Sequence, residues 1–179
     1  MLDWGGGRGG RERLLVCLDL QRGSQPDGRA PDGCLVNCRR VLAHARREGW
    51  RVVHIHSKNP DAGAARPIDG LEPLLNEPVL YRSGLSAFSN RAFQEMIEGR
   101  RSVELVIIGY SMTASLVGTA LIAYEEALSV TMVEDAICSA VLDQETRDAI
   151  ELLGKAATSF ATLSCTDEVI GAPRLRRVV

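Results

Sequence analysis

The sequence contains no apolar run long enough to cross a membrane. Its longest strongly apolar stretches lie near residues 14–20 and 103–110, whereas a membrane-spanning helix needs about 20 such residues. The opening segment, MLDWGGGRGGRER, is glycine-rich and charged, and it lacks the apolar centre of a secretory signal. We therefore expect a cytoplasmic protein with no membrane partner.

A concentrated basic patch is also missing. The formal net charge is −2, and the basic residues are scattered along the chain. Proteins whose main partner is a nucleic acid carry a basic patch or run, so the sequence favours a small-molecule partner instead. Lysine itself is scarce, because of the 21 basic residues only Lys58 and Lys155 are lysines, which leaves 19 arginines. Because arginine is so much commoner than lysine in this sequence, an arginine at a position where a motif has lysine can reflect composition alone.

No two cysteines have the Cys-x-x-Cys spacing that is typical of redox and zinc sites. The cysteines number five, and an odd number leaves no closed disulfide framework: Cys17, Cys34, Cys38, Cys138 and Cys165. Unpaired cysteines are among the residues most often buried. We therefore predict five reduced thiols, most of them in the core, with Cys138 as a structural thiol rather than a pocket residue.

The length and composition predict one globular domain. The chain has 179 residues, 45% of them hydrophobic and 25% charged, which is the size and usage of a single folded unit. Residues 1–12 match G-x-G-x-x-G by count, but no strand precedes them, so they do not predict a phosphate site. We expect a flexible tail over residues 1–12 and a single domain over residues 13–179.

Strand and helix patterns alternate along the domain. Apolar runs typical of buried parallel strands occupy residues 14–20, 51–57, 103–110, 129–133 and 159–163. Helical spacing or capping residues predict helices over residues 34–48, 89–98 with Ser89 as its cap, 113–127, 143–155 and a short last one capped by Thr166. Residues 58–81 have no clear period and are expected to form a substrate-facing or interface loop. The alternation predicts an α/β fold with a three-layer, doubly wound, mostly parallel sheet.

Polar residues follow three of these segments. Ligands bind at the carboxyl ends of the strands in an open parallel sheet, because loops and helix N-termini converge there. We therefore expect the candidate site residues to share one edge of the sheet. They are Asp19, Gln21, Arg82, Ser86, Phe88, Tyr110, Ser111 and Ser115.

These segments resemble the motifs of the isochorismatase-like cysteine hydrolases. That family has Asp-x-Gln after the first strand, then Lys-x-x-x-Ser-Ala-Phe, then Gly-x-x-Thr-x-x-Cys-Val with Thr-Ala two residues further on, and a strand ending in Asp-Ala. The matching text is LDLQRG (18–23), RSGLSAF (82–88), GYSMTASLVGTA (109–120) and MVEDAICS (132–139). The order and spacing agree across residues 14–140, so the resemblance implies the isochorismatase-like fold.

The resemblance implies a catalytic set of Asp, Lys and Cys. This set falls on Asp19, Arg82 and Ser115, so two of the three residues depart from the family pattern. A third departure, Met112, stands in the same turn as Ser115 where the family usually has threonine. A single Cys-to-Ser change made to trap a complex would not explain the other two departures.

The resemblance also implies a pocket for a small substrate, with no cofactor and no metal. Backbone N–H groups of Ser111 and Ser115 would form an oxyanion hole, after a cis peptide bond between Tyr110 and Ser111. The remaining residues expected to meet the substrate are Gln21, Ser86, Phe88 and Tyr110. Relatives usually assemble into homodimers or larger homo-oligomers, and we expect the same of this chain.

Serine in place of cysteine shifts the chemical work to a base. A thiol, with a reference pKa of ≈ 8.5, readily becomes a thiolate beside a cation at a helix N-terminus. A hydroxyl attacks only if a base removes its proton, and Asp19 is the evident base. Arg82 cannot relay a proton, because a guanidinium stays charged; it can clamp an anion or hold Asp19 ionised.

Three functions remain open at this point. The first is hydrolysis of an amide-like or imide-like C–N bond, with Ser115 as nucleophile and Asp19 as base. The second follows the branch of the family that cleaves the vinyl ether of isochorismate without a cysteine. In that case Asp19 would donate a proton, Arg82 would hold a substrate carboxylate, and Ser115 would line the pocket. The third is a small-molecule binding or scaffolding protein that has lost the reaction.

His54 and His56 are a weaker candidate for function. They lie two residues apart on a predicted strand, so they share a face and could ligate a metal together. Relatives that bind metal use an Asp-x-His spacing after this strand, and that spacing is absent here. We therefore expect core or pocket histidines rather than metal ligands.

Overall fold

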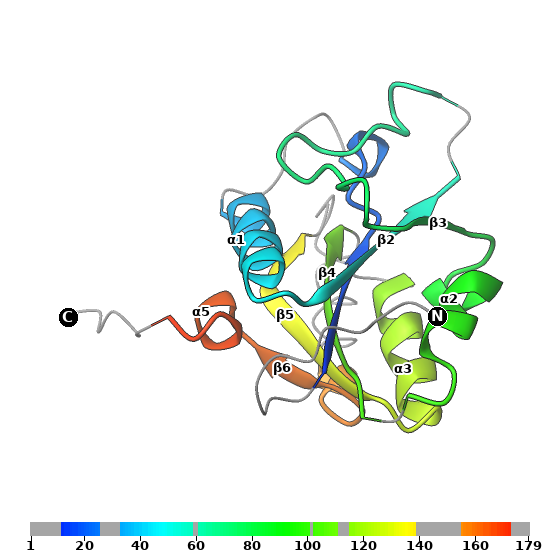
Figure 1. The fold of residues 1–179 in the computed structure, drawn as a ribbon, viewed down its shortest axis with the longest axis vertical. Helices are drawn as coiled ribbons and strands as arrows, with labels where there is room; N and C mark the ends of the chain where they lie inside the picture. Colours follow the sequence, from blue (N-terminus) through cyan, green and yellow to red (C-terminus); the bar gives the residue numbers. More distant parts are fainter. Residues whose placement is uncertain are drawn as a thin grey trace.

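A six-stranded parallel sheet runs through the centre of the protein in the computed structural model (Figure 1). The structure describes residues 12–25, 33–58, 61–100, 102–110, 115–138 and 155–172. The strand order is β3-β2-β1-β4-β5-β6, and each neighbouring pair is parallel. The strands are β1 (Arg13–Leu18), β2 (Arg51–Ser57), β3 (Val79–Arg82), β4 (Glu104–Tyr110), β5 (Ser129–Cys138) and β6 (Thr162–Ser164).

Helices cover both faces of this sheet. On one face lie α1 (Cys34–Arg47) and the short α5 (Thr166–Val169), and on the other lie α2 (Arg91–Ile97) and α3 (Val117–Glu125) (Figure 1). Each face has its own apolar cluster, with helix side chains packed on strand side chains. The predicted three-layer, doubly wound α/β fold is thereby confirmed.

The central strands β1 and β4 divide their side chains between the two apolar clusters. Leu14 and Val16 pack toward α2 and α3, whereas Leu15 and Cys17 pack toward α1. All four side chains are fully buried. A strand with two covered faces needs apolar residues at successive positions, which explains why these segments read as continuous apolar runs.

The site is positioned where β1 and β4 lie side by side. Strand order reverses here, since the chain moves outward from β1 to β2 and β3, then returns to β4. Leu18 and Gly109 are partners in the β1–β4 register. A Cβ atom at residue 109 would collide with the carbonyl oxygen of Leu18. Glycine therefore allows the carboxyl ends of the two strands to approach closely.

Several local predictions differ from the structure. Strand β6 begins at Thr162 rather than at residue 159. The cap of α5 is Cys165 rather than Thr166, whose hydroxyl bonds Asp135 instead. Residues 79–81 were predicted to lie in a loop, but they form most of β3. The sequence pattern missed this strand because it is short, lies at the edge of the sheet and has residues that alternate between exposed and half-buried. Strand β5 continues to Cys138, five residues beyond the predicted end, because its register with β4 shifts and then resumes. The cap of α2 is Asn90, whose side chain accepts the N–H of Phe93, and Ser89 lies in the preceding turn (Ala87–Ser89).

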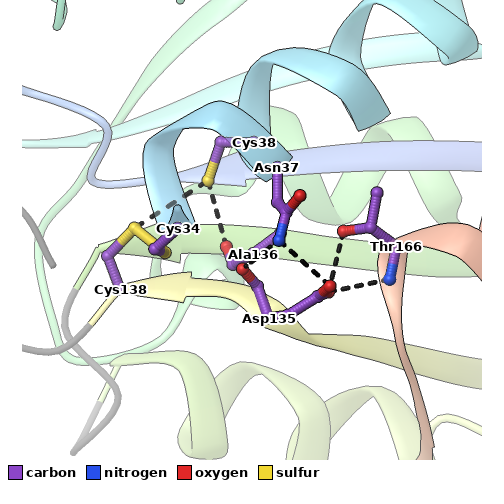
Figure 2. The surroundings of a disulfide bond; sticks show 7 residues. All are labelled: Cys34, Asn37, Cys38, Asp135, Ala136, Cys138 and Thr166. Carbon is purple, nitrogen blue, oxygen red and sulfur yellow. Dashed lines mark hydrogen bonds between the residues drawn. A yellow bond between two sulfur atoms is a disulfide. The ribbon is translucent and has the colours of Figure 1, made fainter. Parts of the chain in front are cut away.

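The prediction of five reduced cysteines is wrong for one pair. Cys34, at the start of α1, forms a disulfide with Cys138, at the end of β5 (Figure 2). The two Cα atoms lie 5.6 Å apart although 104 residues separate them in the sequence. Only the packing of α1 over β5 brings the two cysteines together, so their spacing in the sequence could not predict the disulfide. Cys17, Cys38 and Cys165 are free thiols, and the first two are buried.

Several predictions fall outside the described residues. These are residues 1–11 of the tail predicted over residues 1–12, most of the helix over residues 143–155, and Ser111 with its expected cis peptide bond. Among the helices that the structure does describe, none combines the length and the apolar character needed to span a bilayer.

Candidate active site

Asp19 lies immediately after β1, in a turn that takes its side chain out of the strand's alternation. Its φ of 53° is in the left-handed region, which aspartate tolerates better than most residues with a Cβ atom. Its amide N–H donates to the carbonyl of Ile55 on β2, at 2.8 Å, which anchors the turn. The residue is only 2% exposed, so its carboxylate is held in a nearly dry position at the edge of the sheet.

Arg82, the last residue of β3, forms a two-point ion pair with Asp19. Its Nη2 lies 2.9 Å from Oδ2 of Asp19, and its Nε lies 3.1 Å from Oδ2 and 3.2 Å from Oδ1. The third nitrogen, Nη1, donates to the carbonyl of Gly84 at 2.7 Å. Each nitrogen of the guanidinium is thus bonded within the protein. This geometry fits the planar fork of arginine, which a lysine ammonium does not have.

Ser115 reaches the same carboxylate from the other side of the switch point. Its Oγ donates to Oδ2 of Asp19 at 3.2 Å, and the residue is 4% exposed. It lies in the helical turn that leads into α3. The structure therefore brings Asp19, Arg82 and Ser115 together, although they come from three segments far apart in the sequence.

Thr119 links the serine to the 82–88 segment. Its hydroxyl donates to the carbonyl of Ser115 at 2.6 Å and accepts the N–H of Ala87 at 3.0 Å. The Oγ of Ser86 lies 3.4 Å from the same hydroxyl and accepts the N–H of Phe88 at 3.1 Å. Sequence reasoning gave Thr119 no role, although its Thr-Ala pair belongs to the motif over residues 109–120. That motif was the available signal.

The polar atoms of Gln21 are engaged within the protein. Its Oε1 accepts the N–H of Ser57 at 2.9 Å, and its Nε2 donates to the carbonyl of Ala65 at 3.2 Å. The side chain is buried and ties the end of β2 to the segment over residues 61–70. These bonds give Gln21 a positioning role, and its contact with a substrate stays a prediction.

The aromatic candidates lie in the interior. Phe88 packs edge-on against Phe93, with ring centroids 5.2 Å apart, as part of the cluster beneath α2 and α3. Tyr110 is fully buried at the end of β4, and burial raises the pKa of its phenol. Contacts of either ring with a substrate remain predictions.

His54 belongs to a buried polar network, and the ring of His56 is buried beside it, with the two ring centroids 6.3 Å apart. Nε2 of His54 lies 2.9 Å from Oε2 of Glu77, and Arg46 donates to both carboxylate oxygens of Glu77 at 2.8 Å. Burial would raise the pKa of Glu77, but hydrogen bonds from Arg46, the Leu74 N–H and His54 outweigh it and lower the pKa to about 2. This contact engages Nε2 of His54, whereas Nδ1 is buried and has no hydrogen-bond partner among the described residues.

His56 is held neutral by its surroundings. Burial lowers its pKa to about 4, and repulsion from His54 adds to this effect, while the charge of Asp19 opposes it. The ring is 3% exposed and packs edge-on near Tyr81, with centroids 6.0 Å apart. A neutral imidazole therefore stands next to the carboxylate of the site.

A groove of about 1090 Å³ opens between α2 and α3 and is bordered by part of the 82–88 segment. Ser86 and Phe88 contribute to its lining, but Asp19, Arg82 and Ser115 do not. Exposed apolar side chains such as Leu85 and Leu121 border it. The groove adjoins the polar cluster through its support residues and does not contain the cluster itself.

The arrangement supplies two chemical capabilities. A buried carboxylate accepts a hydrogen bond from a hydroxyl, which is the relationship between a general base and a nucleophile. A guanidinium neutralises and orients that carboxylate through a two-point contact. A serine hydroxyl, a base and a fixed orienting group are the parts required for acyl transfer.

Comparison with known proteins places these residues in a family context. A family model described as the isochorismatase domain matches residues 13–168, which include each candidate site residue. No curated protein matches the sequence.

Several solved structures share the fold. An isochorismatase from Pseudomonas putida KT2440 has a TM-score of 0.76 at 22% identity, covering 88% of this chain and 90% of its own. An isochorismatase family protein from Desulfovibrio vulgaris subsp. vulgaris str. Hildenborough has a TM-score of 0.74 at 22% identity, covering 90% and 100%. MAR1 ribonuclease from Caenorhabditis elegans has a TM-score of 0.73 at 17% identity, covering 90% and 81%. At these identities the likeness concerns the fold.

Proposed function

Because the chain belongs to the isochorismatase family, we propose that it is a hydrolase in which Ser115 attacks an amide-type or imide-type carbonyl and Asp19 acts as the general base. The observation that carries this proposal is the 3.2 Å hydrogen bond from Oγ of Ser115 to Oδ2 of Asp19. Both residues are buried, and exclusion of water strengthens the electrostatic interactions in such a site. The substrate is a small polar or carboxylated molecule.

The reaction proceeds by acyl transfer through the serine. Oγ of Ser115 bonds to the carbonyl carbon as its proton passes to Asp19, and backbone N–H groups at residues 111 and 115 receive the oxyanion. Asp19 then returns the proton to the leaving nitrogen as the C–N bond breaks. Water attacks the acyl-serine, again losing a proton to Asp19, and releases the carboxylic acid. The serine regains its proton and the enzyme is restored.

Arg82 orients the base in this scheme. Its Nε and Nη2 are bonded to Asp19 and its Nη1 to Gly84, so no donor nitrogen is left without a bond inside the protein. These bonds support a role for Arg82 in orienting Asp19 rather than in binding a substrate carboxylate. In this structure the Asp19 carboxylate accepts bonds from the Arg82 guanidinium and from the Ser115 hydroxyl, which is the arrangement that a general base for Ser115 requires.

The test is a turnover screen on primary amides, imides and isochorismate. The intact protein is compared with Ser115→Ala, Asp19→Asn and Ser115→Cys. We expect Ser115→Ala to lower turnover of the best C–N substrate by at least about 10³-fold, and Asp19→Asn by about 10²- to 10⁴-fold. Mass spectrometry of the quenched reaction should detect an acyl group on Ser115 that Ser115→Ala lacks.

The matched control is Ser129→Ala. Ser129 is a partly exposed serine at the start of β5, at the opposite end of the strands from the site, so its removal should leave turnover unchanged. Full activity in Ser115→Ala with loss in Asp19→Asn would contradict the nucleophile and favour cleavage of a vinyl ether by proton donation. If no substrate turns over and Ser115→Cys gains amidase activity, the binding or scaffolding function is favoured instead.

The setting of the reaction is proposed in the same terms. We place the protein in the cytoplasm, as one domain over residues 13–179 that acts on a small molecule rather than a nucleic acid and uses no cofactor in the reaction. We further propose that it forms a homodimer or larger homo-oligomer. Leu121 and Tyr124 support this, because both are exposed on α3. Light scattering across a dilution series tests the oligomeric state.

A further inference from the structure

Three cysteine sulfurs meet where the first turn of α1 packs on the end of β5 (Figure 2). Cys34 and Cys138 form the disulfide, and Sγ of Cys38 lies 4.0 Å from Sγ of Cys138. The three sulfurs all lie within 4.8 Å of one another. Among the described residues, no other group of three cysteine, histidine or carboxylate ligand atoms is close enough to hold a metal ion.

We propose that Cys34, Cys38 and Cys138, once the disulfide is reduced, bind a zinc ion through their three thiolates. The disulfide and the metal site are then two alternative states of one centre. Reduction by a dithiol converts the disulfide to two thiols while the dithiol becomes a disulfide. Zinc then displaces the protons of the three thiols, and its fourth position is open to a water molecule.

The spacing of the sulfurs fits this ligand set. With Zn–S bonds of ≈ 2.3 Å at tetrahedral angles, two ligand sulfurs lie about 3.8 Å apart. Sγ of Cys38 and Sγ of Cys138 are separated by 4.0 Å before any metal is bound. Cys34 and Cys38 are four residues apart in α1, so they project from the same face of the helix. A single ion can therefore contact all three sulfurs after rotation of side chains.

The surrounding hydrogen bonds keep α1 against β5 when the disulfide is open. Nδ2 of Asn37 donates to the backbone carbonyl of Asp135 at 3.1 Å and to its Oδ2 at 3.0 Å. The other carboxylate oxygen, Oδ1, accepts the N–H and the hydroxyl of Thr166, both at 2.7 Å. Figure 2 shows these bonds beside the sulfurs. The three cysteines consequently stay close to one another without a covalent link.

Electrostatics favour zinc over a monovalent ion at this position. Three thiolates carry a charge of −3, so Zn²⁺ leaves −1 and Cu⁺ would leave −2 in a site where Cys38 and Cys138 are fully buried. The N-terminus of α1 is capped by Gly33 without any side-chain bond, and no acidic residue lies in its first turn. Its positive dipole end, worth about half a charge, is thus available to offset the residual negative charge.

The test measures zinc binding to the full chain in its two redox states. One sample is reduced with a phosphine and desalted without oxygen, and the other is left oxidised. Each is titrated with Zn²⁺ in competition with a chromophoric chelator. We expect one zinc ion per chain in the reduced protein and none in the oxidised protein. Titration with Co²⁺ should give thiolate-to-metal charge-transfer absorption only in the reduced sample.

Two variants locate the site. Cys38→Ser removes one ligand and leaves the disulfide intact, and it should weaken zinc binding by at least about 10- to 100-fold, the usual cost of disturbing even an outer-shell partner. Cys165→Ser removes a free cysteine outside the cluster and should bind zinc like the parent protein. Equal zinc binding in the reduced and oxidised parent protein would overturn the proposal. So would full-strength binding by Cys38→Ser.

Discussion

Arg82 and Asp19 meet in a two-point ion pair across the edge of the sheet, with Nη2 2.9 Å and Nε 3.1 Å from the same carboxylate oxygen. The Asp19 side chain is 3% exposed and the Arg82 side chain 19%. A buried charge that loses its partner is costly, because neither water nor another group replaces the lost interaction. The pair therefore acts on stability as well as on the orientation of the base.

Arg82→Ala should lower the free energy of unfolding by roughly 3 kcal/mol at neutral pH, the lower end of the range for breaking a buried pair. The double variant Arg82→Ala with Asp19→Asn should lose less, since no unpaired carboxylate remains. Urea denaturation of the four members of this cycle measures both values. Arg91→Ala is the control, because the Arg91–Glu95 pair is exposed on α2 and should contribute under about 0.5 kcal/mol. Equal losses from Arg82→Ala and Arg91→Ala would contradict a buried pair.

Gly109→Ala should impair the site by separating β1 from β4. The new methyl group would meet the carbonyl of Leu18, and crowding of this kind costs about 1–3 kcal/mol. The displacement would lengthen the bond from Ser115 to Asp19, so turnover should fall more than the stability loss alone explains. Gly118→Ala serves as the control, since a Cβ atom there meets nothing within 4 Å. Thermal unfolding and turnover measured on both variants check this, and unchanged turnover in Gly109→Ala would count against it.

Thr119→Val should reduce turnover because Ser115 is no longer held in position, although the catalytic groups themselves remain. Valine keeps the shape but cannot bond the Ser115 carbonyl or the Ala87 N–H. We expect kcat to fall by about tenfold, equal to ~1.4 kcal/mol of barrier, with little change in KM. Thr119→Ser restores the hydroxyl and should recover kcat. Steady-state kinetics decide the matter, and a change confined to KM would point to substrate binding instead.

His56 should make the protein less stable in mild acid. Its pKa is lowered to about 4 in the folded state from an ordinary value of 6.5, so the unfolded chain binds more protons between these values. Stability is therefore fully present above pH 6.5 and is lost as the pH falls toward 4, by about 3 kcal/mol. The lowered pKa of His54 acts in the same direction. Urea unfolding at a series of pH values gives the slope.

The control for this pH effect is His56→Gln. Glutamine does not titrate, so the slope between pH 6.5 and pH 4 should become shallower, leaving the part that belongs to His54. Glu77 acts at lower pH, because its pKa is lowered to about 2 from 4.5. The stability that its carboxylate contributes to the folded protein is present above pH 4.5 and is lost as the pH falls from 4.5 to 2. An unchanged slope in His56→Gln would mean that His56 is already charged in the folded protein at pH 6.

The arrangement of the core could be predicted because its physical cause is local. Strands with both faces covered must be apolar at every position, and β1 and β4 fulfil this from Leu14 to Leu18 and from Leu105 to Ile108. The meeting of Asp19 and Ser115 follows from the rule that parallel strands open their carboxyl ends to one edge. The resemblance of residues 82–88 to a family motif predicted that Arg82 lies at the same edge.

Other features depend on contacts that no sequence pattern contains. The Cys34–Cys138 pair arises from the packing of a helix on a strand end, with 104 residues between the two cysteines. The role of Thr119 depends on a turn of α3 lying beside Ala87, and both residues look like ordinary helix and loop residues by themselves. Gln21 was expected to face the substrate, but its amide bonds depend on a loop whose shape has no motif.

The backbone at Asp19 has a consequence for anyone who alters this protein. Because its φ is 53°, a replacement must first tolerate a left-handed turn before its chemistry can be judged, and asparagine and glycine do this far better than alanine or glutamate. Libraries that randomise position 19 would thus be filtered by conformation before function. Of the tolerated pair only asparagine keeps a side chain of aspartate's size, so Asp19→Asn is the substitution in which a loss of turnover can be assigned to the missing charge.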